Sequence, residues 1–239
     1  MECPMISKNT AGYNTQSFAS ENFSKLKGVM YERHVPRGEK IYWEGEECQH
    51  IYFLKQGAVK LTKSSDEGKD LVLYYFQSGD LFGDLKDDVH ITNSYTAEAI
   101  SDCTLGVIQQ KDLETLLWQN GDLAIDFMKW LGYMQRFLQT KLRDLLFFGK
   151  NGALASTLIR MSNTYGVSEG NKVRFTNRLT NSELGDLIGS TRETVNRMLN
   201  QLKREEIIDY EGGVITIRDI DRLKAICHCE GCPSSICRL

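Results

Sequence analysis

The amino-acid sequence predicts an α+β protein with a β-barrel, one long helix and a C-terminal helix-turn-helix that is followed by a hairpin. Three observations support this fold class. Short apolar runs broken by glycine fill residues 29–107, and a stretch without proline and with few glycines covers residues 111–148. Capping residues then separate two short helical segments. A chain of 239 residues leaves room for one or two domains.

The composition is that of an ordinary globular protein, with 41% hydrophobic and 26% charged residues. No apolar run approaches the length of a membrane span, and the polar N-terminus lacks the apolar stretch of a secretory signal. We therefore expect a cytoplasmic protein with no membrane partner. In that reducing compartment, clustered cysteines favour metal ligation over disulfides.

The N-terminal half is expected to be a barrel that follows a flexible segment. Residues 1–20 are rich in serine, asparagine and threonine, which is typical of flexible chain. Residues 21–120 contain the runs KIYW, HIYFLK, AVKLTK and DLVLYYF, each followed by turn residues. Aromatic and β-branched residues at such regular intervals predict a β-barrel of the jelly-roll kind.

Residues 121–148 are predicted to form one long amphipathic helix that ends in a glycine-containing hinge. Its apolar residues recur at helical spacing: Phe127, Leu131, Met134, Leu138, Leu142 and Leu145. A helix of this length exceeds what a small barrel covers, so we expect it to be a dimerisation helix that packs partly on its twin in a second subunit. The alternative is a helix that lies wholly on its own barrel.

Residues 149–226 have the layout of a winged helix-turn-helix. Thr180 or Asn181 is expected to cap the first helix, and Gly189 to end it. A second helix follows, and a double glycine then joins two short β-branched runs into a hairpin.

The second of these helices carries the residues expected to read DNA. Residues 190–204 contain four basic side chains and one acidic side chain, although the whole chain has a net charge of −3. Four polar residues share the face opposite the buried one: Arg192, Glu193, Asn196 and Arg197. Arginine suits the acceptors of guanine, and a carboxylate suits the amino group of cytosine. The alternative is a winged helix that binds protein through the same surface charges.

Four of the seven cysteines lie in residues 227–239, as Cys227, Cys229, Cys232 and Cys237. Thiolates at such close spacing favour an iron–sulfur cluster, and the proline after Cys232 is common in cluster-binding loops. Four thiolates also satisfy a tetrahedral zinc ion. An unligated tail is the third alternative, and the residues alone leave all three open.

The segment RETVNRML resembles the recognition helix of the CRP/FNR superfamily of bacterial transcription regulators. The barrel resembles the cyclic-nucleotide-type domain of the same superfamily. The residues at matching intervals are Gly38, Ile41, Gly45, Tyr52, Gly57 and Lys60. The resemblance covers residues 25–225 and implies a homodimer on a palindromic, TGTGA-like DNA operator, with RNA polymerase as a further partner. It also implies that Arg192, Glu193 and Arg197 read the half-site.

The barrel departs from the pattern of the cyclic-AMP-binding members. Those members grip the phosphate with an Arg-Ser pair, and Tyr95 and Thr96 stand in its place here. Asp84, Asp87 and Asp88 add negative charge where a phosphate needs a cation or an array of donors. We therefore expect a degenerate pocket that binds no cyclic nucleotide.

The cysteine spacing at the C-terminus makes the chain most similar to the Bacillus-type FNR group. That resemblance implies a 4Fe–4S cluster held by Cys229, Cys232 and Cys237 together with an aspartate from the dimer-helix region. Asp144 is the only acidic residue near the end of the long helix and takes this fourth position, with Cys227 as the rival fourth ligand.

The resemblance thus implies an oxygen-responsive, anaerobic transcription regulator. The alternative is a zinc-stapled regulator of the same superfamily that responds to another signal. Catalysis is not expected, because the four histidines are scattered and the sequence has no glycine-rich phosphate loop and no nucleophile beside a base.

Overall fold

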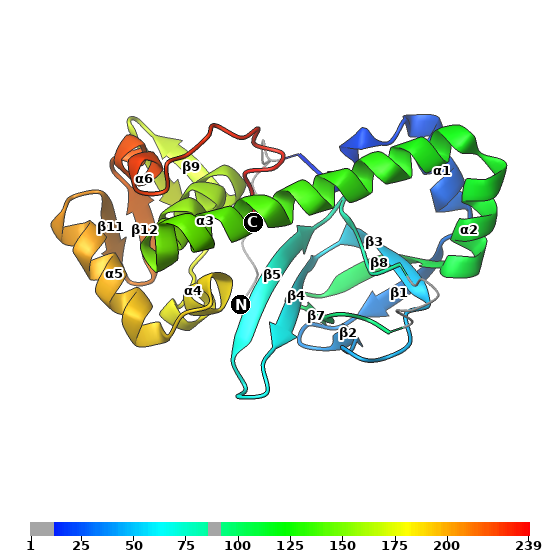
Figure 1. Ribbon diagram of the computed structural model, residues 1–239, viewed down its shortest axis with the longest axis horizontal. Coiled ribbons are helices and arrows are strands. Elements are labelled where there is room, and N and C mark those ends of the chain that lie inside the picture. The colour runs from blue at the N-terminus through cyan, green and yellow to red at the C-terminus, as the bar shows by residue number, and fades with distance from the viewer. Residues whose placement is uncertain (1–11, 86–91) are drawn as a thin grey trace. The chain divides into compact units, whose positions relative to one another are not determined.

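The structure is a computed structural model that describes residues 12–85 and 92–239. It contains two compact units, one made of Tyr13–Ser65 and Val72–Gln135 and the other formed mainly by Arg136–Leu239. The described residues form three four-stranded sheets and six α-helices (Figure 1). The predicted α+β fold class is confirmed.

Two of the sheets make the N-terminal barrel, with strand orders β1-β8-β3-β6 and β2-β7-β4-β5. Its elements are η1 (Asn14–Ser17), α1 (Ser20–Gly28), β1 (Tyr31–Val35), β2 (Lys40–Tyr42), β3 (His50–Gln56), β4 (Ala58–Ser64), β5 (Asp70–Gln77), β6 (Leu81–Phe82), β7 (Thr96–Ala99), β8 (Cys103–Gln109) and α2 (Gln110–Gln119). Gly57 turns β3 into β4 with a φ of 105°. A Cβ there would lie 2.6 Å from the carbonyl oxygen of Asp102, so this turn requires glycine.

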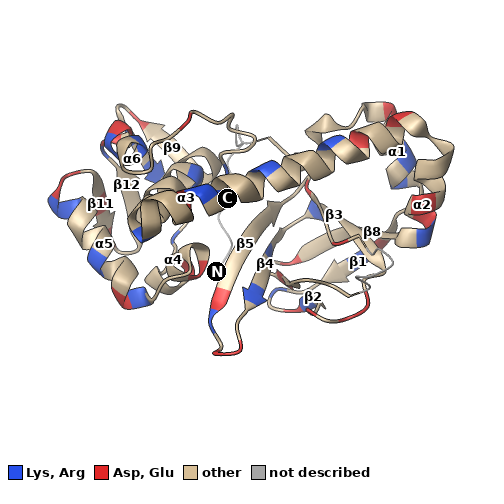
Figure 2. Cartoon of the chain, in the orientation of Figure 1, with Lys and Arg blue, Asp and Glu red and all other residues tan. Residues whose placement is uncertain are grey.

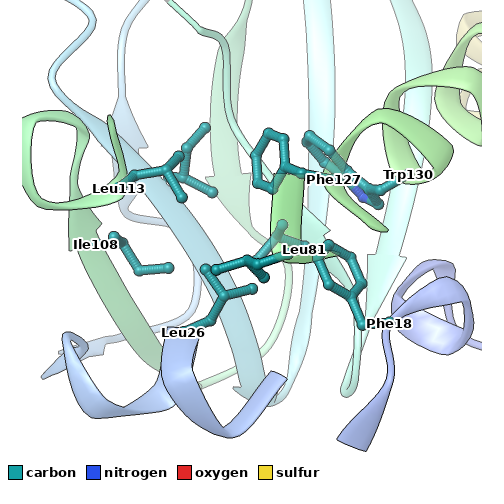
Figure 3. Packing of buried hydrophobic residues seen from close by; sticks show 9 residues of the cluster. Phe18, Leu26, Leu81, Ile108, Leu113, Phe127 and Trp130 are labelled. Atoms are coloured by element: carbon teal, nitrogen blue, oxygen red, sulfur yellow. The ribbon is translucent and has the colours of Figure 1, made fainter. Parts of the chain in front are cut away.

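The start of the long helix α3 (Gly121–Tyr165) packs on the barrel through buried apolar residues. Figure 3 shows this cluster, which consists of Phe18, Leu26, Ile51, Leu81, Ile108, Leu113, Leu123, Phe127 and Trp130. The rings of Phe127 and Trp130 lie 5.0 Å apart. Burial of this apolar surface fixes the first turns of α3 on the barrel.

The predicted apolar stripe on α3 changes from buried to exposed along the helix. Phe127 is buried in the barrel cluster, whereas Leu131 and Leu142 are exposed. The exposed apolar residues of this part of α3 also include Ile125, Met128 and Leu146. Within one chain the stripe is therefore only partly covered by the barrel, and packing of its exposed part on a second subunit stays a prediction.

The helix α3 is broken at Gly149, whose φ of 58° and ψ of −160° are not helical. This backbone region is essentially restricted to glycine. Beyond the break, every residue of 152–161 is buried, so the second half of α3 is the central helix of the C-terminal unit.

The rest of the C-terminal unit is a helix-turn-helix with a four-stranded sheet of order β11-β12-β10-β9. Its elements are β9 (Gly166–Glu169), β10 (Lys172–Phe175), α4 (Asn181–Ile188), α5 (Arg192–Arg204), β11 (Ile208–Glu211), β12 (Val214–Ile217) and α6 (Ile220–Ile226). Thr180 caps α4 in a capping box with Glu183, and Gly189 ends it in the left-handed conformation. Thr191 caps α5. The predicted caps and hairpin are confirmed.

Candidate functional site

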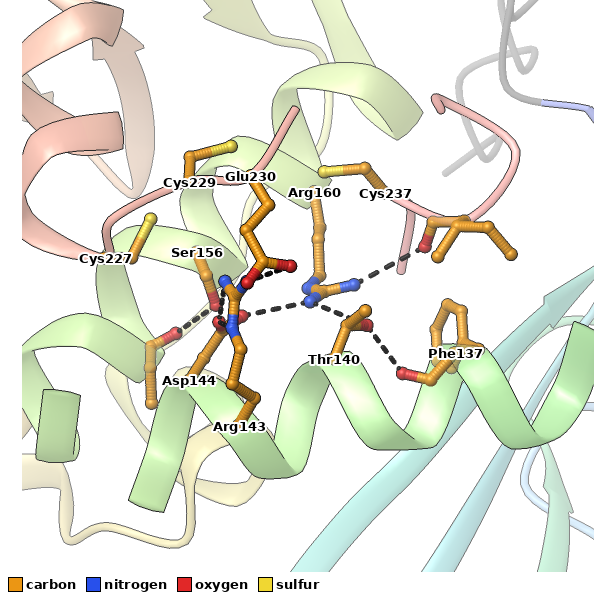
Figure 4. A network of polar contacts seen from close by, with 12 residues as sticks. Phe137, Thr140, Arg143, Asp144, Ser156, Arg160, Cys227, Cys229, Glu230 and Cys237 are labelled. Atoms are coloured by element: carbon orange, nitrogen blue, oxygen red, sulfur yellow. Dashed lines mark hydrogen bonds and ion pairs between the residues drawn. The ribbon is translucent and has the colours of Figure 1, made fainter. Parts of the chain in front are cut away.

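Asp144, the predicted fourth ligand, is buried near the end of the first half of α3 and is 1% exposed. Its Oδ1 accepts hydrogen bonds from Arg143, from Nε at 3.0 Å and from Nη2 at 2.6 Å. Its Oδ2 accepts one from Nη2 of Arg160 at 3.0 Å (Figure 4). Because a carboxylate oxygen has two lone pairs, Oδ2 keeps one for a further donor or a metal.

The three predicted cysteine ligands and the rival ligand Cys227 line one pocket together with Asp144. The other residues that line it are Thr140, Arg143, Ser156, Ile159, Arg160 and Glu230. The side chains of Cys229 and Cys237 point toward one another beside Arg160 (Figure 4). Cys227 is 1% exposed, and its thiol donates a long hydrogen bond of 3.5 Å to the carbonyl oxygen of Leu223.

The thiols of Cys227 and Cys237 in this pocket are neutral near pH 7. Burial raises the pKa of Cys227 to about 11, and the negative charge of Asp144 acts in the same direction. Burial also raises the pKa of Cys237, while the positive charge of Arg160 opposes the rise. A metal that binds these sulfurs must therefore displace their protons.

The donors that line this pocket, cysteine thiols and one carboxylate, are of the kinds that bind iron–sulfur clusters. Across residues 12–85 and 92–239, no three Cys, His, Asp or Glu side chains converge closely enough to hold one metal ion. Zinc requires its donors around one centre, whereas the donors to a 4Fe–4S cluster bind different irons. Cysteines and a carboxylate that line one pocket are compatible with the second case.

Sequence reasoning missed the charged residues that surround Asp144. Arg143 reaches outward as well, with its Nη1 2.6 Å from Oε2 of Glu230 in the cysteine segment. Arg160 could have been found, because it is the only charged residue between Lys150 and Glu169. A lone charge in an otherwise uncharged, buried helix indicates a buried partner.

The cysteine segment is attached to both halves of α3. His228 stacks on Phe148, next to the break in the helix, with ring centroids 4.8 Å apart. Asn163 donates a hydrogen bond of 2.6 Å to the carbonyl oxygen of Cys237, and the amide of Leu239 donates one of 3.1 Å to Thr164. The tail is thus packed on the C-terminal unit rather than extended into solvent.

The helix α5 presents all of the predicted DNA-reading residues on its surface. Arg192, Glu193, Asn196 and Arg197 are exposed, while Val195 and Leu199 on the opposite face are buried. Figure 2 shows basic positions along this helix. Asn196 accepts a hydrogen bond of 3.3 Å from the side chain of Asn181 on α4. The arrangement suits a helix that lies in the major groove of DNA.

Aromatic rings occupy the interior of the barrel. Tyr42 stacks on Tyr52, Tyr52 on Phe82, Phe82 on Phe76, and Phe76 on Tyr74, with ring centroids 5.2–5.5 Å apart. Burial raises the pKa of Tyr52 to about 12, and it also raises the pKa of Tyr42 and of Tyr74. The three hydroxyls therefore stay neutral near pH 7.

Two of the residues that depart from the cyclic-AMP-binding pattern, Asp84 and Thr96, make hydrogen bonds within the barrel. Oδ2 of Asp84 accepts a hydrogen bond of 2.6 Å from the amide of Ser94, and the Thr96 hydroxyl accepts one of 3.1 Å from the amide of Glu44. Asp87 and Asp88 lie outside the described residues. None of the helices that the structure describes has the length and apolar character of a membrane span.

Comparison with known proteins agrees with this architecture. The cyclic nucleotide-binding domain family matches residues 32–120, and the Crp-like helix-turn-helix domain family matches residues 152–226. The anaerobic regulatory protein of Bacillus subtilis is 35% identical over 223 residues, which cover 92% of this chain and 94% of that protein. The chain belongs to the CRP/FNR family of DNA-binding transcription regulators. Members of this family are regulators rather than enzymes, and they typically bind DNA as dimers.

Other CRP/FNR relatives match with lower identity. The CRP-like cAMP-activated global transcriptional regulator of Mycobacterium tuberculosis is 27% identical over 79% of this chain and 84% of that protein. Among solved structures, FixK2 of Bradyrhizobium japonicum is 24% identical with a TM-score of 0.69, covering 83% of this chain and 97% of its own. A CooA mutant of Carboxydothermus hydrogenoformans is 20% identical with a TM-score of 0.74, covering 92% and 98%. These two structures support the fold alone.

Proposed function

We propose that this CRP/FNR regulator responds to oxygen through a 4Fe–4S cluster on its C-terminal cysteines. In the proposal, Cys229, Cys232 and Cys237 hold the cluster, and Asp144 supplies the fourth ligand. The active form is a homodimer that binds a palindromic, TGTGA-like operator and works with RNA polymerase in the cytoplasm.

The observation that carries the proposal is the pocket in which three chain segments meet. The long helix contributes Asp144, the central helix of the C-terminal unit contributes Arg160, and the tail contributes the cysteines. When bound, a cluster supplies an oxygen-labile link between the tail and the long helix. Similarity to a Bacillus subtilis protein named as an anaerobic regulator supports a response to oxygen.

Asp144 is favoured over Cys227 as the fourth ligand because of what each group already contacts. Asp144 lines the pocket and its Oδ2 accepts one hydrogen bond, whereas the Cys227 thiol donates to Leu223 of the helix that it follows. Oxygen is a harder donor than sulfur, so the carboxylate is the weaker contact to iron. Loss of this contact would leave ion pairs and hydrogen bonds to hold the tail.

Regulation then follows as a shift between two arrangements of the DNA-binding helices. The link joins Asp144 before the break at Gly149 to a tail that lies beyond it, so it restrains the backbone at that break. Loss of the restraint lowers the population of the DNA-binding arrangement, and operator affinity falls.

DNA reading and dimerisation are assigned to separate surfaces. In the proposal, the exposed residues Arg192, Glu193, Asn196 and Arg197 of α5 contact base edges, and loss of one bidentate contact costs about 1–3 kcal/mol. The exposed apolar residues of α3 suit a coiled coil with the same helix of a second subunit. The ring-filled barrel supports the further proposal that no cyclic nucleotide binds there.

The proposal is tested by purifying the full chain without oxygen and assaying iron, acid-labile sulfide and zinc. Operator binding is measured by gel shift before and after exposure to air. We expect brown protein with four irons per chain that bleaches in air and then binds DNA more weakly. Colourless, zinc-containing protein with air-insensitive DNA binding would instead support the zinc-stapled alternative.

The fourth ligand is assigned by comparing Asp144→Ala with Cys227→Ala. We expect Asp144→Ala to lose iron and oxygen-sensitive DNA binding, and Cys227→Ala to keep both. The reverse result would make Cys227 the ligand.

A further inference from the structure

Arg160 is an unusual residue for its position. It lies on the second half of α3, in a run of consecutive buried residues, and is only 4% exposed. A buried cation is costly unless it is paired and hydrogen-bonded. A buried arginine in the central helix therefore requires a structural or functional reason.

The guanidinium of Arg160 joins three segments of the C-terminal unit. Nη2 donates to Oδ2 of Asp144 at 3.0 Å and to the Thr140 hydroxyl at 3.2 Å, both on the first half of α3. Nη1 donates to the carbonyl oxygen of Ile236, next to Cys237, at 3.4 Å. The guanidinium carbon also lies 5.8 Å from the ring centroid of Phe137. One planar cation thus holds both the proposed carboxylate ligand and the tail.

One donor of Arg160 has no partner within the described part of the chain. Its Nε is buried and makes no hydrogen bond there. Arg160 lines the pocket together with all four tail cysteines. An unpaired buried N–H is unfavourable, and it is satisfied if an acceptor such as sulfur enters the pocket.

We propose that Arg160 is the positioning residue of the cluster site, which orients Asp144 and the tail and donates from Nε to sulfur when the cluster is bound. This inference rests on the proposed function, because it requires a cluster in the pocket. Arg143 differs, since it binds the other oxygen of Asp144 and reaches outward to Glu230.

Two properties of the cluster depend on such a residue. Groups that orient metal ligands typically change metal affinity about 10–100-fold when they are removed. A nearby positive charge and hydrogen bonds to sulfur also stabilise the reduced cluster, which carries one electron more, and so raise its reduction potential. A residue that served folding alone would leave the potential of the bound cluster unchanged.

The test uses the full chain, reconstituted with iron and sulfide without oxygen, as wild type, Arg160→Gln and Arg160→Lys. Arg174→Lys is the matched control, because Arg174 pairs with Glu169 at 3.7 Å on the exposed surface of the same unit. Iron loss to a chelator under anoxic conditions and the reduction potential are measured. Circular dichroism reports whether each variant folds.

We expect Arg160→Gln to lose iron about tenfold faster than wild type and to have a lower potential. Arg160→Lys keeps the positive charge, so we expect the reduction potential of its cluster to be close to that of wild type. It still loses iron faster, because a single ammonium does not span Asp144, Thr140 and Ile236. Arg174→Lys behaves as wild type in both assays.

Wild-type behaviour of Arg160→Gln in both assays would overturn the inference and leave the proposed function intact. Faster iron loss with an unchanged potential would overturn the role as a donor to the cluster. If Arg160→Gln does not fold, wild-type iron retention in Arg160→Lys overturns the inference and faster loss supports it. A wild-type chain that takes up no cluster removes both the proposed function and the inference.

Discussion

The barrel interior and the cysteine pocket are both buried, but they are lined by opposite kinds of side chain. Stacked rings fill the barrel, and its tyrosine hydroxyls stay neutral. The cysteine pocket instead contains thiols, a buried carboxylate and a buried guanidinium. The interior of the barrel, which belongs to a cyclic nucleotide-binding family, is therefore lined by neutral rings, whereas the pocket of the other unit holds a buried ion pair beside its thiols.

The two regions also differ in what they contribute to stability. Each aromatic pair in the barrel adds about 0.5–1.5 kcal/mol beyond its buried area. Buried ion pairs such as that of Asp144 and Arg160 add little net stability, because removing both ions from water is costly. Such a pair is better explained by the need for a specific arrangement of groups than by stabilisation of the fold.

The largest expected difference between the regions is in iron binding. Cys229→Ser in the pocket should abolish iron binding, because a hydroxyl is a poor substitute for a thiolate on iron. Cys103→Ser, in the barrel strand β8, is the control and should bind as much iron as wild type. Iron and sulfide are assayed after anoxic purification. Equal iron in the two variants would remove the distinction between tail and barrel cysteines.

The next expected effect is on folding stability. Asp144→Ala leaves two arginines without their shared partner and should lower the free energy of unfolding by about 3–5 kcal/mol. The free energy of unfolding is measured by urea denaturation of the metal-free protein, so that loss of the cluster does not contribute. A loss below about 1 kcal/mol, the range of exposed ion pairs, would mean that the pocket is open to water.

A smaller effect of opposite sign is expected in the barrel. The Tyr42 hydroxyl is buried and has no hydrogen-bond partner among the described residues. Tyr42→Phe removes this unpaired group and should raise the free energy of unfolding by about 1 kcal/mol. The same urea experiment measures it. Destabilisation would indicate that the hydroxyl is satisfied, for example by bound water, and that the barrel interior is less apolar than its rings suggest.

The smallest expected effect is that of cyclic AMP on the barrel. We expect a saturating concentration to leave the thermal unfolding midpoint and operator binding unchanged, because the rings occupy the interior and Tyr95 and Thr96 replace the phosphate-binding pair. A ligand that binds the native state stabilises it in proportion to its occupancy. Saturable calorimetric binding would therefore contradict the degenerate pocket.

Local chemistry explains why much of the fold could be predicted from sequence. The caps at Thr180 and Thr191 depend on residues within three positions, and the alternation of the barrel strands depends on their near neighbours. The cysteine spacing likewise predicted that the tail cysteines lie close together, and they line one pocket. These signals lie within short segments and need no knowledge of tertiary contacts.

The missed features depend on contacts between distant segments. The partners of Asp144 include Arg160, sixteen residues away, and Arg143 meets Glu230 only after the tail has folded back. Which apolar residues of α3 are buried depends on where the barrel surface ends. The spacing of residues in the sequence does not predict these contacts between distant segments. The single arginine in an otherwise uncharged helix did, however, indicate a buried charged partner.

The contacts of Arg160 with Thr140 and Asp144 require that these two residues project from the same side of the long helix. These two residues are four positions apart and so project from the same side, since each residue of an α-helix turns the next by about 100°. Insertion of one residue between them would rotate one away from the guanidinium, whereas surface loops of the barrel tolerate changes in length. Divergent sequences that keep this pocket should therefore vary freely in loop size but conserve the residue count of this helical turn.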